Sequence, residues 1–214
     1  MNRLGLLHPS TLTTKNSPET LSLYFAFSKH LSQITNHAPV TYSLQSSGAL
    51  IGPYGILLHD PAIGHAILSL YQAILASPKA SSTLTPRTKA IISLVISANE
   101  RSQYMTYFHS TLSLHASTLT MNEVHSLRAG LCASTFNRVD RSVFGMTREL
   151  CVESGVLPDN IWNEAIGILG KDGATAIVHF VAFQRYLSTI ERAFDAQVPA
   201  EGERVEVSIY QMER

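Results

Sequence analysis

The stretch that decides the fold is RSQYMTYFH, residues 101–109, read together with the apolar run before it. Thr85-Pro86 opens that run with a hydroxyl that can accept from free helix amides and a proline that needs no donor in the first turn. The apolar character then continues without turn residues through Ala98 into residues 104–115. This pattern favours a helix from Pro86 onward, although residues 91–96 taken alone also fit a buried strand.

Helix signals also occur on the N-terminal side of this stretch. Ser17-Pro18-Glu19 predicts a helix over residues 17–36. Asp60-Pro61 opens a second helix, and its two apolar stripes indicate that it is sandwiched between other elements. Prolines and glycines predict irregular structure at residues 37–55, and small polar residues predict a loop at 77–83.

The C-terminal side continues the helical pattern. Thr120 and Glu123 form a capping box, which predicts a short helix that ends near Gly130. Apolar spacing predicts three more helices, over residues 139–154, 158–169 and 173–194. The predicted fold class is therefore all-α, with residues 201–214 as a loose tail or an arm that packs on another subunit.

Composition limits the classes of function. The chain has 214 residues, of which 45% are hydrophobic, and a formal net charge of +0, which fits a single domain over residues 1–214. Basic residues are scattered among acidic ones, so nucleic acid is not an expected partner. Because no signal-peptide pattern and no run of about 18 apolar residues occurs, we expect a soluble cytoplasmic protein that binds no membrane.

The sequence contains no pattern for a metal or a cofactor. Cys132 and Cys151 stand far apart, without a second cysteine at metal or redox spacing, and both are expected to be small buried residues. No His-Glu-x-x-His motif, phosphate-binding loop or dinucleotide fingerprint occurs. We therefore expect neither a bound metal nor a cofactor.

Four short motifs, taken in chain order, resemble the carboxymuconolactone decarboxylase family. They are LLHDP at residues 57–61, LTPR at 84–87, Gln103-Tyr104 with His109, and the closing segment 194–199. The resemblance covers about residues 52–199, with 1–51 as an N-terminal helix and entry loop and 200–214 as a tail. It implies an all-α fold of the alkylhydroperoxidase D-like (AhpD-like) superfamily and a homo-oligomer, whether dimer, trimer or hexamer.

The residues that the family uses for chemistry are largely replaced. The peroxidases carry a Cys-x-x-Cys pair followed by a histidine, and this chain has Ser102 and Met105 at the two cysteine positions. The acid on the preceding helix aligns with about Ala90. The decarboxylase-like pattern has Glu-Trp at Met105-Thr106, so only His109 remains. Without thiols the chain is not expected to be a thiol peroxidase.

Helical spacing defines the candidate site. Ser102, Met105 and His109 fall on one face with Thr106 beside it, and His109 is the candidate acid or base. The alternative is a core histidine held by a backbone carbonyl. Tyr104 matches a family residue and is a second catalytic candidate, or a packing residue. Two further candidates for substrate binding are His59, which alternatively bonds the chain entering its helix, and Arg185, within the apolar last helix.

Three functions are compatible with this pattern. The first is a non-redox, cofactor-independent cyclase, isomerase or decarboxylase that binds a lactone- or polyketide-like small molecule in an apolar pocket and moves a proton with His109. The second is a non-catalytic binding or assembly protein on the same scaffold. The third is a true carboxymuconolactone decarboxylase with a displaced acid such as Glu100.

Overall fold

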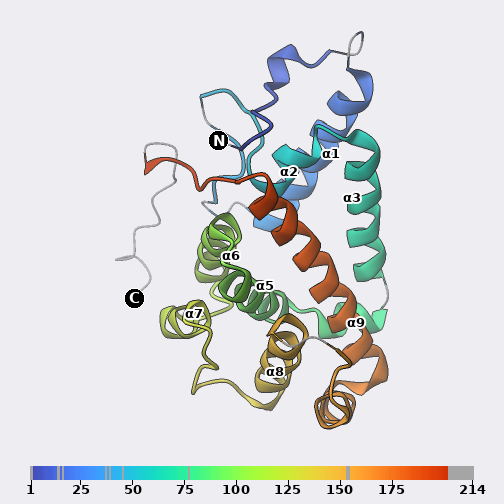
Figure 1. Cartoon of the computed structure of the whole chain (residues 1–214), viewed down its shortest axis with the longest axis vertical. Coiled ribbons are helices and arrows are strands. Elements are labelled where there is room, and N and C mark those ends of the chain that lie inside the picture. The colour runs from blue at the N-terminus through green and yellow to red at the C-terminus, as the bar shows by residue number, and fades with distance from the viewer. Residues whose placement is uncertain are drawn as a thin grey trace.

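A helix that is buried on all sides lies at the centre of the fold. In the computed structural model, α5 (Pro86–Glu100) has every residue from Ala90 to Ser97 buried. The Thr85 hydroxyl accepts a hydrogen bond of 3.1 Å from the Thr88 amide, which caps the helix as predicted. This segment is therefore a helix and not the alternative strand. Four other helices pack around it, α6 (Gln103–His115), α7 (Met121–Arg128), α8 (Arg138–Val152) and α9 (Asp159–Ala193) (Figure 1).

The structure describes residues 2–13, 15, 17–36, 38, 40–44, 46–76, 78–152 and 155–201. Within these residues the architecture is all-α, as predicted, with one short 3-10 turn at Pro9–Thr11 and an isolated bridge between Ser43 and Leu50. The remaining helices are α1 (Pro18–Thr35), α2 (Gly52–Leu57), α3 (Pro61–Ala76) and α4 (Pro78–Thr83). The predicted tail lies outside the described residues, except for its first residue, Glu201.

The predicted continuous helix from Pro86 through residue 115 is wrong at one point. Arg101 adopts a left-handed conformation with φ 56°, and α5 ends there. Ser102 then begins α6, because its hydroxyl accepts from the Met105 amide. Two helices therefore meet at a sharp corner, and Ser102 lies at the start of the second one rather than along its face.

Two expected irregular segments contain helices. The loop predicted at residues 77–83 forms α4, which packs against α9. The segment predicted as irregular at 37–55 contains α2, whose six residues are all buried. Helix α2 begins at Gly52 with φ 65°, and a Cβ atom at this position would overlap the Tyr104 ring. Burial in the core stabilises α2, whereas α4 packs on α9 and buries Ala80. Local sequence signals do not report these tertiary contacts.

Helix α9 joins the two helices predicted at 158–169 and 173–194. Gly170, with φ 73° and ψ 164°, breaks the helical geometry where the two predictions stop and start. By length and composition α9 is apolar enough to cross a membrane. It nevertheless packs against α4, α5 and α8 and buries residues such as Ile177 and Phe180, which makes it a core helix of this fold (Figure 1).

Helix α3 differs from the prediction that it is sandwiched. Only Gly64 and Leu68 are buried, whereas Ile63 and Leu70 are 46% and 45% exposed. Helix α3 lies at the edge of the fold (Figure 1), and within one chain it leaves apolar side chains such as Ile63 and Leu70 exposed.

Arg87 ties three helices together at the start of α5. Its guanidinium bonds Glu123 on α7 at 2.6 Å and Asp140 on α8 at 3.0 Å, and it donates to the Thr118 carbonyl. Both carboxylates are buried, so they depend on the arginine for their charge balance. The hydrogen bond from Arg87, together with other bonds at this site, holds the pKa of Glu123 at about 2.

We expect Arg87→Met to lower the free energy of unfolding by about 3 kcal/mol, because it leaves two buried carboxylates without a cation. Chemical denaturation at neutral pH measures this loss. Arg192→Met is the matched control, since Arg192 is 53% exposed and makes one ion pair of 3.4 Å, so its loss should cost less than about 1 kcal/mol. Equal costs for the two variants would contradict this role for Arg87.

Candidate active site

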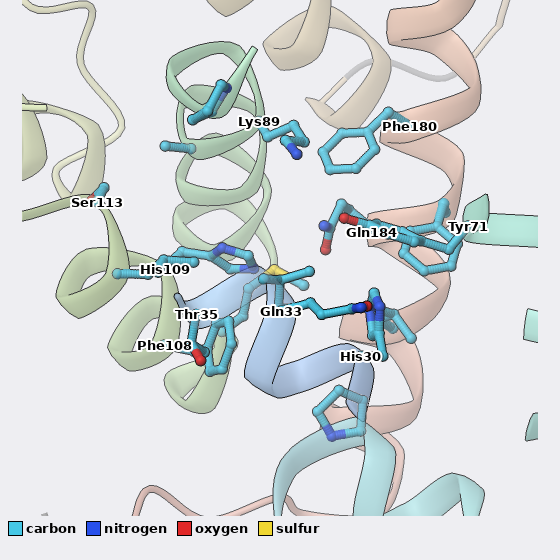
Figure 2. A pocket seen from close by; sticks show the side chains of 18 of the residues that line it. His30, Gln33, Thr35, Tyr71, Lys89, Phe108, His109, Ser113, Phe180 and Gln184 are labelled. Atoms are coloured by element: carbon cyan, nitrogen blue, oxygen red, sulfur yellow. The ribbon is translucent and has the colours of Figure 1, made fainter. Parts of the chain in front are cut away.

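One cavity of about 690 Å³ opens between α1, α2, α3, α5, α6 and α9. This volume suits a drug-sized molecule. Its wall is mainly aliphatic and aromatic, and the side chains in Figure 2 converge on it from helices that are far apart in sequence. Among the described lining residues, Glu191 is the only acid and Lys89 the only lysine or arginine.

The carboxyl group of Glu191 sits at the meeting point of α9 and α6. Glu191 is 4% exposed, and its Oε2 accepts a short hydrogen bond from the Ser102 hydroxyl. Burial raises the pKa of Glu191 to about 7, against the opposing effect of the bonds from Ser102 and the Met105 amide. The group can therefore gain or lose a proton near neutral pH, as a general acid or base requires.

The two histidines of the cavity are neutral at neutral pH. Burial, reinforced by the positive charge of Lys89, lowers the pKa of both His109 and His30 to about 4. The His30 ring lies 3.4 Å from the Tyr54 hydroxyl. The His109 ring points into the cavity (Figure 2), and no hydrogen bond joins it to another described residue. A neutral imidazole can donate a hydrogen bond to a substrate oxygen or act as a base.

Lys89 and Gln184 face the same space from α5 and α9 (Figure 2). Burial lowers the pKa of Lys89, and no described side chain forms an ion pair with it. Gln184 is 5% exposed, and its Oε1 atom has no hydrogen-bond partner among the described residues. Lys89 and Gln184 therefore bring to the cavity wall a cation and an acceptor that no described protein group satisfies.

Tyr104 lines the cavity, but its hydroxyl is engaged in the fold. It donates to the Thr41 carbonyl at 3.4 Å, and the Tyr107 hydroxyl accepts from the Thr41 amide at 3.2 Å. Burial raises the pKa of Tyr104 well above its usual value. This bonding fits a wall residue better than a proton donor.

The remaining predicted site residues divide into two groups. Met105 lines the cavity, and Ser102 contacts it only through Glu191. Three residues lie outside the lining: Thr106 donates to the Ser102 carbonyl, the His59 ring bonds the Gly5 carbonyl, and Arg185 bonds Glu100 and the Leu150 carbonyl.

Sequence reasoning gave no role to three polar residues that line the cavity, Glu191, Gln184 and His30. One signal was present in the sequence. Gln184 and Glu191 fall at helical spacing on the same stripe as Phe180 and Leu187, so two polar residues interrupt an apolar face of α9. Polar side chains on a core stripe indicate either buried partners or a ligand.

The cysteines lie away from this chemistry. Neither Cys132 nor Cys151 lines the cavity. Cys132 is exposed, so its predicted burial is wrong, and Cys151 is partly buried. Burial raises the pKa of Cys151 to about 11, which keeps it in the unreactive thiol form. No group of three potential metal ligands occurs among the described residues.

The fold is that of the AhpD-like class, and comparison with solved structures shows this directly. The AhpD core of an uncharacterized peroxidase-related protein from Ralstonia eutropha superposes with a TM-score of 0.67 at 13% identity, over 94% of this chain and 93% of that chain. A variant of the debrominase Bmp8, in complex with 2,3,4-tribromopyrrole, superposes with a TM-score of 0.64 at 15% identity, over 88% and 90% of the two chains.

Sequence comparison adds no closer relationship. No family model matches the chain, and no curated protein matches it. The structural likeness at 13–15% identity therefore establishes the AhpD-like fold that the sequence motifs imply. A fold does not define a reaction, so the function is inferred from the side chains of the cavity.

We expect the Glu191 carboxyl to titrate near pH 7. In infrared difference spectra the carbonyl band of the protonated acid should disappear as the pH rises through about 7, because burial favours the neutral form up to that pH. Glu191→Gln should lack this band. A band that is already absent at pH 5 would contradict the assignment.

The neutral state of His109 should make the protein sensitive to acid. The unfolded chain binds a proton at about pH 6.5 and the folded chain only at about pH 4, so stability present above pH 6.5 is lost as the pH falls towards 4. His109→Gln should reduce this loss by on the order of 2 kcal/mol in denaturation series. His115→Gln, at an exposed histidine of the same helix, should leave the loss unchanged.

Proposed function

We propose that the protein is a non-redox, cofactor-independent enzyme that moves a proton on a mainly apolar, lactone- or polyketide-like small molecule, as a cyclase, isomerase or decarboxylase. The observation that carries this function is the buried carboxyl of Glu191, with a pKa of about 7, at the wall of an apolar cavity. Catalytic carboxyl groups are tuned in this way by burial.

The roles of the two main groups follow from their protonation states. As a carboxylate, Glu191 takes a proton from a carbon next to a carbonyl group, and the electron pair moves onto the carbonyl oxygen to form an enolate. Neutral His109 donates a hydrogen bond to that oxygen and stabilises its developing charge. In a substrate with a C=C double bond next to that carbon, the enolate is a conjugated dienolate. Glu191 then returns the proton to the far end of the dienolate, so the double bond moves without any change in oxidation state.

Glu191 also has a second environment. It lines an outer hollow of about 240 Å³, together with Ser102, Gln103 and Arg192. Glu191 therefore lines both the main cavity and this smaller hollow. We propose that Glu191 exchanges its proton with solvent through this hollow when a substrate fills the main cavity.

This mechanism extends the resemblance to the carboxymuconolactone decarboxylase family. Ala90, at the position where that family places an acid on the preceding helix, lines the cavity. Glu191 supplies a carboxyl to the same cavity from α9. The absence of thiols at Ser102 and Met105 supports non-redox chemistry.

Two other functions remain as alternatives. A true carboxymuconolactone decarboxylase with Glu100 as its acid is supported less well, because Glu100 pairs with Arg185 at 2.9 Å and with Arg192 at 3.4 Å and does not line the cavity. A non-catalytic binding protein is compatible with the apolar wall. The titratable carboxyl at the wall favours an enzyme, because binding alone does not require one.

We also propose that the protein is a homo-oligomer. The exposed side chains Ile63 and Leu70 on α3 support this, because a second copy would remove them from water.

The proposed function predicts that Glu191→Gln slows turnover by about 10²- to 10⁴-fold, because it removes the group that moves the proton. Biosynthetic lactones, polyketide-type ketones and carboxymuconolactone itself, incubated with purified protein in deuterated water, are followed by mass spectrometry for depletion or deuterium uptake. The wild-type value of kcat/KM should rise with pH through about 7, because the carboxylate is the active form.

Two further variants complete this experiment. His109→Gln should slow turnover less than Glu191→Gln, because one hydrogen bond to the enolate is lost. His59→Gln, at an exposed residue outside the cavity, should react like the wild type. Unchanged turnover by Glu191→Gln would contradict the mechanism. If the wild type binds these compounds without converting them, the protein is a binding protein and not an enzyme.

A further inference from the structure

Two polar side chains of the cavity, Gln184 and Lys89, lack hydrogen-bond or ion-pair partners among the described residues. The missing partners indicate which chemical groups a ligand would carry. Gln184 Oε1 is buried without a hydrogen-bond donor among the described residues, a situation that costs about 1–3 kcal/mol. Lys89 is partly buried, and no described carboxylate pairs with it. Both side chains reach the cavity, from opposite helices (Figure 2). A molecule that satisfies both groups would gain affinity from each.

The Lys89 ammonium group and the Gln184 Oε1 atom bind different chemical groups. The Lys89 ammonium group offers only donors and a positive charge, so an anionic oxygen satisfies it best. The Gln184 Oε1 atom only accepts, so it needs an O–H or N–H group. The nearby imidazoles carry no charge that would compete for the anion, since burial and Lys89 hold the pKa of His30 and His109 at about 4.

The rest of the wall determines the shape of the ligand. Phe180 and Phe183 stack with their ring centres 6.4 Å apart, and Tyr71 lies 5.3 Å from Phe183. Phe108 adds a ring on the α6 side. Aromatic faces favour flat, unsaturated molecules, and a cavity of about 690 Å³ holds more than one ring.

Building on the proposed function, we propose that the substrate is a flat, unsaturated molecule of more than one ring. It carries an anionic oxygen, as a carboxylate or enolate, that binds Lys89 Nζ, and an O–H or N–H group that donates to Gln184 Oε1. Glu191 and His109 then face the part of the molecule that lies between these two anchors and the α6 wall.

Three naphthalene probes separate the two anchors. They are 6-hydroxy-2-naphthoate, which has both groups, 6-methoxy-2-naphthoate, which lacks the donor, and 6-hydroxy-2-naphthalenemethanol, which lacks the anion. Isothermal titration calorimetry with the full chain should give the lowest Kd for the first probe. Loss of either group should raise Kd about tenfold, the effect of one charge-assisted or buried hydrogen bond.

Two variants test each anchor. Lys89→Met should bind the two naphthoates about tenfold more weakly and the neutral alcohol as well as the wild type does. Gln184→Met should bind the hydroxy and methoxy probes equally. Neither variant should unfold at a lower temperature, because each replaces a polar group that has no described partner with an apolar one of similar length.

Three results would contradict this ligand class. The first is that the wild type binds none of the probes, and the second is that it binds the neutral alcohol most tightly. The third result is that both variants keep the wild-type differences in Kd between the probes. Glu191→Gln distinguishes the substrate class from the reaction. If this variant keeps the probe preferences and also keeps turnover, the ligand class stands and the mechanism falls. If the wild type turns over a neutral molecule while the probe preferences are absent, the mechanism stands and the ligand class falls.

Discussion

The burial of α5 on all sides is the constraint on which the rest of the structure depends. A helix with a fully buried middle can accept charged groups only near its ends, where they find partners or open space. Arg87 finds carboxylates on α7 and α8, and this pairing fixes those helices against the core. Lys89, two residues further along, reaches the cavity instead. The same helix thus fixes the scaffold and supplies the only lysine or arginine among the described lining residues.

The cavity also shows where this AhpD-like fold places a buried acid. Residue 90 is an alanine, and the carboxyl comes from Glu191 on the last helix. The Ser102 hydroxyl holds that carboxyl from the start of α6. The support for the acid therefore comes from the corner between α5 and α6.

The sequence predicted most of the helices because their starts carry local signals. The Thr85 cap and the capping box of Thr120 and Glu123 both form as expected. The corner at Arg101 was missed because an arginine, unlike a glycine, gives no local sign of a left-handed conformation. His109 and Met105 could be placed at the cavity from helical spacing. Glu191 could not, because the bond that brings it to Ser102 joins residues 89 positions apart.

Gly52 determines the position of a cavity-lining side chain, the Tyr104 ring. It has no contact with the cavity itself, yet the Tyr104 ring packs against its bare α-carbon so closely that any side chain there would push the ring away. Its positive φ adds a second barrier to replacement. A mutation at this buried start of α2 would therefore reshape the binding space without touching it, so relatives of this protein could differ in substrate while sharing every residue that touches it.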